Sequence, residues 1–251
     1  MLNGLAAAVP GLDMGLVLTY LRLQAFLLML PGIGERMVPG RVKVAIAMSL
    51  APLLSGISGP GPDTADAAGL LLPALTEIAV GLAAGTLVRI MAFAIDIGTS
   101  AIAASTSLAQ IVGGANEASP HPVGNMLHLG GIAILFTLGL PVMMVQLLAD
   151  SFVLWPLGAV PDIAAILPEI VSYVARSFGL AMTLAAPFIL GGFLYQALSG
   201  VINKVMPQLP VLFIGAPGSI LLALVALVVI APLLVAVWAD AVLSISLPGV
   251  P

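Results

Sequence analysis

The sequence contains no cysteine, which excludes disulfides, thiolate nucleophiles and metal sites built from cysteine. Charge is also scarce, with seven lysines and arginines and eleven aspartates and glutamates in 251 residues. A soluble domain of this length needs far more charge to cover its surface. The basic residues form no run or stripe, so nucleic acid is excluded as a partner.

Motifs of catalysis and cofactor binding are missing as well. Neither G-x-S-x-G nor H-E-x-x-H occurs, and no glycine-rich loop is followed by Lys-Ser or Lys-Thr. His121 and His128 have no acidic cluster at ligand spacing, so no metal site is expected. We interpret both histidines as residues at a junction between a loop and a helix. The sequence therefore contains no motif that indicates an enzyme or a bound cofactor, and an intramembrane enzyme is a distant alternative.

Apolar residues take the place of the missing charge. They make up 61% of the chain, which places it in the membrane class. Because a helix needs about 20 apolar residues to cross the bilayer core, we predict six long hydrophobic helices. They cover residues 14–30, 44–57, 70 to beyond 96, 123–149, 178–202 and 219–237. The predicted fold class is an all-α integral membrane protein with a single domain over residues 1–251.

Four charged residues interrupt these apolar helices. Arg22, Glu77, Arg89 and Asp96 each cost about 2.5–3.5 kcal/mol at the centre of a bilayer unless a partner or water is present. Glu77 and Arg89 are more than three turns apart on one helix, and Arg89 and Asp96 share a face without touching. Their partners are therefore expected on other helices or subunits, and a proton or ion relay is the alternative.

A charged turn lies between the first two helices. The stretch GIGERMVPGRVK, residues 32–43, contains Glu35, Arg36, Arg41 and Lys43 between two segments with almost no charge. Because basic loops stay on the cytoplasmic side, this turn is predicted to lie inside and both termini outside. Its prolines and glycines shape the turn, which indicates a docking role as well.

The segment ASTSLAQIVGGANEASPHPVGN, residues 104–125, is the least compatible with lipid in the interior of the chain. An uncovered irregular backbone does not persist at membrane depth, so the segment is predicted to lie in water, in a pore or against protein. Gly113, Gly114, Pro120 and Pro122 make it pliable yet shaped. Taken alone, these residues favour a functional loop and an ordinary solvent loop equally.

Four stretches resemble the FliR family in their order and spacing. They are LPGIGERMVPGRVKVAIAMSLAPLL (residues 30–54), TEIAVGLAAGTLVRIMAFAIDIGTSAI (76–102), LLADSFVLWPLG (147–158) and MPQLPVLFIGAPGSILLALVAL (206–227). The first and the last of these stretches are the most specific. The resemblance covers nearly the whole chain.

This resemblance implies a non-enzymatic component of the flagellar type III protein export gate, in the bacterial inner membrane at the flagellar basal body. Members of the family assemble as one copy with several copies of FliP and FliQ around a pore for unfolded flagellar proteins. An FlhB-type export switch protein is a further expected partner. The fold implied is a FliP-like part followed by a FliQ-like part, with helical hairpins that wrap around the pore. An equivalent subunit of a virulence injectisome and a stand-alone membrane transporter are the alternatives.

The resemblance also suggests roles for individual residues. Segment 105–124 matches a loop that plugs the closed pore. The plug residues expected here are Ser105, Ser107, Leu108, Gln110, Gly113, Gly114, Asn116, Glu117 and His121. The charged residues expected to be buried or to contact other subunits are Arg22, Glu35, Arg36, Arg41, Glu77, Arg89 and Asp96.

Overall fold

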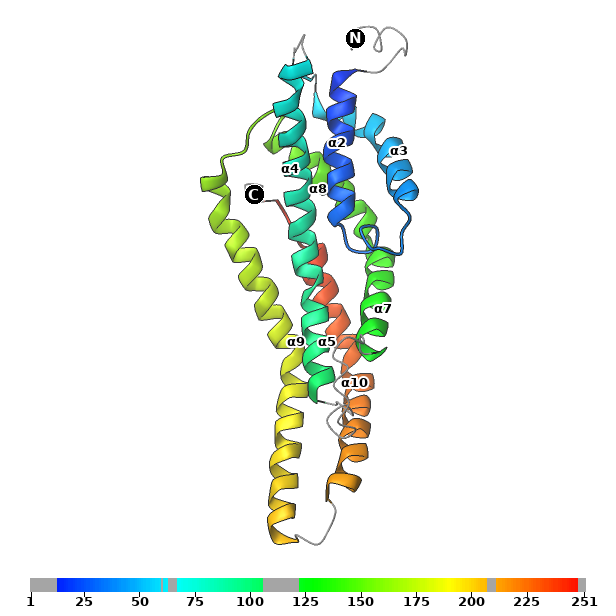
Figure 1. Cartoon of the computed structure of the whole chain (residues 1–251), viewed down its shortest axis with the longest axis vertical. Coiled ribbons are helices and arrows are strands. Elements are labelled where there is room, and N and C mark those ends of the chain that lie inside the picture. The colour runs from blue at the N-terminus through cyan, green and yellow to red at the C-terminus, as the bar shows by residue number, and fades with distance from the viewer. Residues whose placement is uncertain (1–12, 60, 63–66, 106–121, 207–210, 248–251) are drawn as a thin grey trace. The chain divides into compact units, whose positions relative to one another are not determined.

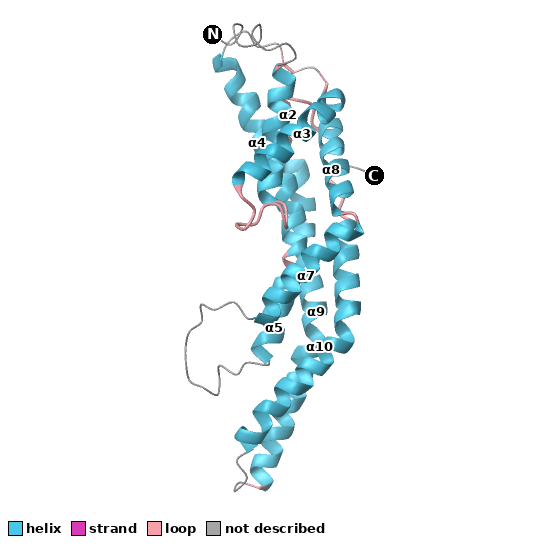
Figure 2. Cartoon of the chain, turned by 90° about the vertical axis from the view of Figure 1, so that its right-hand side faces the viewer, coloured by secondary structure: helices cyan, strands magenta, loops and turns pink. Residues whose placement is uncertain are grey.

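The computed structural model describes residues 13–59, 61–62, 67–105, 122–206 and 211–247. These residues form helices and short connecting segments and contain no strand (Figure 2). In chain order (Figure 1), the helices are α2 (Met14–Met29), α3 (Gly40–Ser58), α4 (Ala67–Ala92), α5 (Ala94–Ser105), α7 (Pro122–Leu138), α8 (Leu140–Leu154), α9 (Ile163–Val205) and α10 (Val211–Leu243). The all-α fold class is confirmed.

The described residues contain fewer helices long enough to cross a membrane than the six predicted. Within the described ranges, four stretches are long and apolar enough: Gly40–Ser58, Gly69–Ser100, Ile163–Val205 and Leu221–Leu243. The bent pair formed by α7 and α8 makes at most a fifth. Helix α2 has 16 residues, which is short of the roughly 20 that a span needs. The predicted orientation of the termini stays a prediction.

Two helix boundaries also differ from the prediction. The predicted helix over 123–149 is divided at Gly139, whose φ of 115° lies in the left-handed region that glycine adopts without strain. The predicted helix over 178–202 begins much earlier, at Ile163, and continues unbroken for 43 residues. A sequence pattern locates helices more reliably than it locates their ends, because packing decides where a helix stops.

The contacts between residues divide the chain into two compact units. Unit 1 comprises Met1–Met91, Phe136–Val174 and Leu243–Pro251, and unit 2 comprises Ala92–Leu135 and Ala175–Val242. Each unit is built from several separate stretches of the chain, so neither corresponds to a continuous piece of sequence. The prediction of a single domain over residues 1–251 stays a prediction.

In unit 1, α2 is the central helix. It packs on α3 and on α4, and α3 in turn packs on α8. Leu23, Phe26 and Leu27 of α2 are fully buried. Gly85 of α4 permits this close packing, because a Cβ there would lie 2.7 Å from the Phe26 carbonyl oxygen and 2.8 Å from Met29 Cβ. Small residues let helix backbones approach each other in this way.

In unit 2, Trp238 of α10 is the largest fully buried side chain. Its indole Nε1–H donates to the carbonyl oxygen of Ala92 at 3.1 Å, at the point where α4 ends and before α5 begins. The indole ring lies against Gly131 of α7, where a Cβ would come within 2.9 Å of Trp238 Cζ3. One side chain therefore satisfies a carbonyl at the helix end and fills the space beside a glycine.

We expect Gly85→Ala to lower the free energy of unfolding. The added methyl group overpacks the contact between α2 and α4 at about 1–3 kcal/mol, which exceeds the gain of about 1 kcal/mol in helix propensity. The midpoint of thermal unfolding of the purified chain in detergent measures the effect. Gly179→Ala on α9 is the matched control, because no heavy atom lies within 4 Å of its added Cβ. Equal midpoints for the two variants would contradict the packing argument.

Candidate functional site

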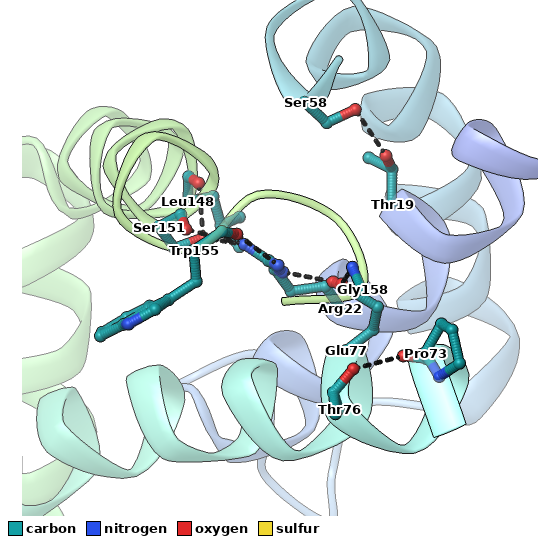
Figure 3. A network of polar contacts seen from close by, with 10 residues as sticks. All are labelled: Thr19, Arg22, Ser58, Pro73, Thr76, Glu77, Leu148, Ser151, Trp155 and Gly158. Atoms are coloured by element: carbon teal, nitrogen blue, oxygen red, sulfur yellow. Dashed lines mark hydrogen bonds and ion pairs between the residues drawn. The ribbon is translucent and has the colours of Figure 1, made fainter. Parts of the chain in front are cut away.

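Arg22 is buried in unit 1 with no exposed surface. Its Nε donates to Glu77 Oε2 of α4 at 2.5 Å (Figure 3). Its Nη1 donates to the carbonyl oxygen of Ser151 at 2.8 Å and to Ser151 Oγ at 3.2 Å. Its Nη2 donates to the carbonyl oxygen of Trp155 at 2.9 Å. One side chain of α2 thus joins α4, α8 and the turn that follows α8.

Glu77 is equally buried and uses both of its carboxylate oxygens. Besides the contact with Arg22, its Oε1 accepts a hydrogen bond from the backbone N–H of Gly158 at 2.8 Å. Gly158 has a φ of 79°, a left-handed conformation that favours glycine. The glycine therefore lets the turn after α8 present its N–H to the carboxylate. We call Arg22, Glu77, Ser151, Trp155 and Gly158 the arginine network.

Other side chains support the arginine network. The Phe152 ring lies below the guanidinium, with its centroid 4.2 Å from Arg22 Cζ, which adds a cation–π contact. Thr19, one turn before Arg22 on α2, donates to Ser58 Oγ of α3 at 3.0 Å. The hydroxyl of Ser151 donates back to the Leu148 carbonyl oxygen at 2.7 Å, which orients it toward the arginine.

The chemistry of the arginine network favours a structural role. A relay needs groups that release and accept protons, whereas a guanidinium keeps its proton and only donates hydrogen bonds. The other members of the arginine network are one carboxylate, one hydroxyl and several backbone groups. The backbone groups cannot take up or release a proton. Opposite charges that are buried together with their hydrogen-bond partners stabilise one arrangement of the helices. The arrangement therefore argues against the alternative of a proton relay through Arg22 and Glu77.

The charged turn before α3 is arranged differently. Lys43 is buried, and its Nζ donates to the carbonyl oxygens of Gly34 and Glu35 at 3.0 and 3.1 Å. The lysine thus holds the backbone of the turn. Arg36 and Arg41 are exposed and Glu35 is half-buried. In the described part of the chain, no ion pair involves these three side chains.

Asp96 and His128 come together in unit 2. The carboxylate oxygen Oδ1 of Asp96 on α5 lies 2.8 Å from Nδ1 of His128 on α7. Sequence reasoning placed the partner of Asp96 on another helix but did not identify His128, which was interpreted only as a residue at a helix junction. No sequence signal marks a pair of residues 32 positions apart. Arg89 is half-buried on α4 and also has an interaction partner.

The expected plug residues fall mostly outside the part of the chain that the structure describes. Ser105 is the last residue of α5. The others, which lie outside the described residues, are Ser107, Leu108, Gln110, Gly113, Gly114, Asn116, Glu117 and His121. Among the described residues, no group of three or more histidines, aspartates and glutamates is placed to hold a metal ion.

Sequence reasoning also missed the backbone half of the arginine network. The conspicuous stretch LLADSFVLWPLG contains Ser151, Trp155 and Gly158. The carbonyl oxygens of Ser151 and Trp155 accept hydrogen bonds from Arg22, and the backbone N–H of Gly158 donates to Glu77. Backbone groups are present at every residue, so the identity of the side chain does not reveal which of them a buried charge will use.

We expect Arg22→Met and Glu77→Met to destabilise the chain strongly, because each leaves a buried charge without its partner, at a cost of about 3–5 kcal/mol. The double variant should lose clearly less than the sum of the two single losses, since no unpaired charge is left. Detergent unfolding followed by circular dichroism measures all four proteins. Arg41→Met, at an exposed arginine, is the control and should be close to neutral. Additive losses would show that the two charges are not coupled.

The chain is similar to known bacterial export proteins over most of its length. The family model described as bacterial export proteins, family 1, matches residues 14–245. The flagellar biosynthetic protein FliR of Caulobacter vibrioides is 29% identical over 232 residues, which cover 89% of this chain and 90% of the relative. The protein of the same name from Aquifex aeolicus is 28% identical, covering 87% and 86%, and that from Bacillus subtilis is 23% identical, covering 85% and 84%. The chain therefore belongs to the FliR family of bacterial export proteins.

Proposed function

We propose that the chain is a non-enzymatic subunit of the flagellar protein export gate in the bacterial inner membrane, at the flagellar basal body. The observation that carries this proposal is the match to the export-protein family over residues 14–245, together with relatives that are all named for flagellar biosynthesis. Four long apolar helices in the described ranges support a place in the membrane.

The exposed apolar surface supports an assembled state. In the most apolar stretch of Leu221–Leu243 only 11% of residues are buried, and in that of Ile163–Val205 only 28%. Apolar faces of this size need lipid or another protein against them. We propose that FliP and FliQ cover part of this surface, with one copy of this chain and several copies of each partner. The chain would form a FliP-like part followed by a FliQ-like part, wrapped around a pore for unfolded flagellar proteins.

The distribution of charge indicates which residues face the partners. Every contact described above for Arg22 and Glu77 lies within the chain, so these residues hold the subunit together. Arg36 is exposed on a turn whose backbone is fixed by Lys43, and Arg41 is exposed in the first turn of α3. A charge on a fixed backbone loses little conformational freedom when it pairs with a partner. We therefore assign contacts with neighbouring subunits to Glu35, Arg36 and Arg41.

The plug role of residues 105–124 belongs to this proposal as well. It is supported by the polar composition of this segment and by the family to which the chain belongs. A pliable loop with small side chains can leave a pore when its closed and open states differ by only a few kcal/mol. An FlhB-type switch protein is the further partner that we propose for the assembled gate.

Affinity purification of the chain with co-expressed FliP and FliQ, followed by native mass spectrometry, tests the assembly. We expect a discrete complex with one copy of this chain and several copies of the other two. Arg36→Ala should weaken the association by up to about fivefold, the effect of losing one partly exposed ion pair. Ser49→Ala, at an exposed position of α3, is the matched control. Recovery of a monomer or homo-oligomer alone would instead favour a stand-alone transporter.

Deletion of residues 113–117 tests the plug. The complex should still assemble, because the deleted residues belong to the proposed plug and not to the contacts assigned to the subunits. Membranes that contain it should become leaky to small ions, which conductance across a planar bilayer measures. The undeleted complex is the control. Unchanged conductance in a fully assembled complex would argue against the plug.

A further inference from the structure

The contact between Asp96 and His128 joins two helices of unit 2 that are far apart in the sequence. Asp96 lies in the first turn of α5, where the helix dipole favours a negative charge. His128 lies in α7, and the two side chains are 2.8 Å apart at Oδ1 and Nδ1. Their side chains are 34% and 22% exposed, so neither is sealed in the packed interior of the chain. Neither side chain is needed to fill the buried core.

Imidazole is the member of the pair that ordinarily gains its charge near neutral pH, and His128 has a further interaction besides the one with Asp96. Residues adjacent in sequence to Asp96 and His128 line a small cavity. Apolar side chains of α9 and α10 line it as well. The lining residues are Ile95, Gly98, Thr99, Leu127, Leu184, Leu234 and Val235. The charged or titratable residues that α9 and α10 contribute to unit 2 are Arg176, Tyr195, Lys204 and Asp240, and none of them lines this cavity. In the described parts of α5 and α7, Asp96 and His128 are the titratable residues.

We infer that Asp96 and His128 form a protonation-dependent clasp between α5 and α7. With a neutral imidazole the contact is a hydrogen bond to a carboxylate, whereas a protonated imidazole adds the attraction of opposite charges. Acid should therefore tighten the clasp as the imidazole gains its charge. The clasped helices end at Ser105 and begin at Pro122, so the clasp limits the distance between these two points of the chain.

The absence of cysteine makes the clasp directly measurable. Cysteines introduced at Ile97 and Met126, which are 46% and 67% exposed, carry nitroxide labels in the otherwise unmodified full chain in lipid nanodiscs. Pulsed electron paramagnetic resonance then reports the distance between α5 and α7. Lowering the pH from about 8 to 5.5 should increase the population with the shorter distance by about two- to fivefold, the range for a partly exposed ion pair.

Substitutions of the two residues identify the groups responsible. His128→Gln and Asp96→Asn should each abolish the response to pH, and His128→Arg should keep the short distance at every pH because its charge is permanent. His121→Gln is the matched control, since His121 and His128 are the two histidines of the chain, and it should leave the response intact. A response that is absent from the unsubstituted chain, or that survives in His128→Gln, would overturn the clasp.

Salt provides a second test that does not depend on how the variants fold. Raising ionic strength from about 0.05 to 0.5 M at pH 5.5 should reduce the population with the shorter distance, because screening weakens a partly exposed ion pair. An unchanged distribution would show that the charges do not hold the helices together. This inference does not rest on the proposed function. Its failure appears in the labelled chain alone, whereas failure of the export-gate proposal appears in the purification with partners.

Discussion

Burial of the Arg22 guanidinium sets the arrangement of unit 1. Removing such an ion from water costs several kcal/mol unless its donors find acceptors and its charge finds a partner. Here the partners come from α4 and from α8 with the turn after it, so together with α2 three separate parts of the chain must be in place. Gly158 completes the arrangement through its N–H to Glu77. Non-directional apolar packing alone would allow these helices to slide against one another, whereas the fixed fork of a guanidinium allows one register.

The charged residues near the N-terminal helices fall into two groups, buried and exposed. Arg22, Glu77 and Lys43 are buried and directed at groups within the chain. Arg36 and Arg41 are exposed, beside a turn that the buried lysine holds in shape. The buried charges stabilise the chain, whereas the exposed charges remain available for other contacts. Under the export-gate proposal, the contacts with other subunits belong to this small, preorganised surface and not to all the charged residues.

The long apolar helices show where sequence patterns predict helix boundaries and where they do not. The apolar stretches over 219–237 and 178–202 lie within α10 and α9, because a long apolar segment has few alternatives to a helix in lipid. The stretch over 123–149 was equally apolar, yet Gly139 divides it. A glycine has little intrinsic preference for either outcome, since it also occurs inside continuous helices, as Gly179 does in α9. Tertiary packing decides between the two.

The sequence by itself determined the all-α class, the family and the fact that Arg22, Glu77 and Asp96 need partners, because these follow from composition, from motif order and from the cost of a charge in lipid. The tertiary structure decided which partners they take. Glu77 accepts from a backbone N–H, Arg22 donates to backbone carbonyl oxygens, and Asp96 meets a histidine on another helix. Backbone groups look alike along any sequence, and contacts between distant residues exist only once the helices have packed.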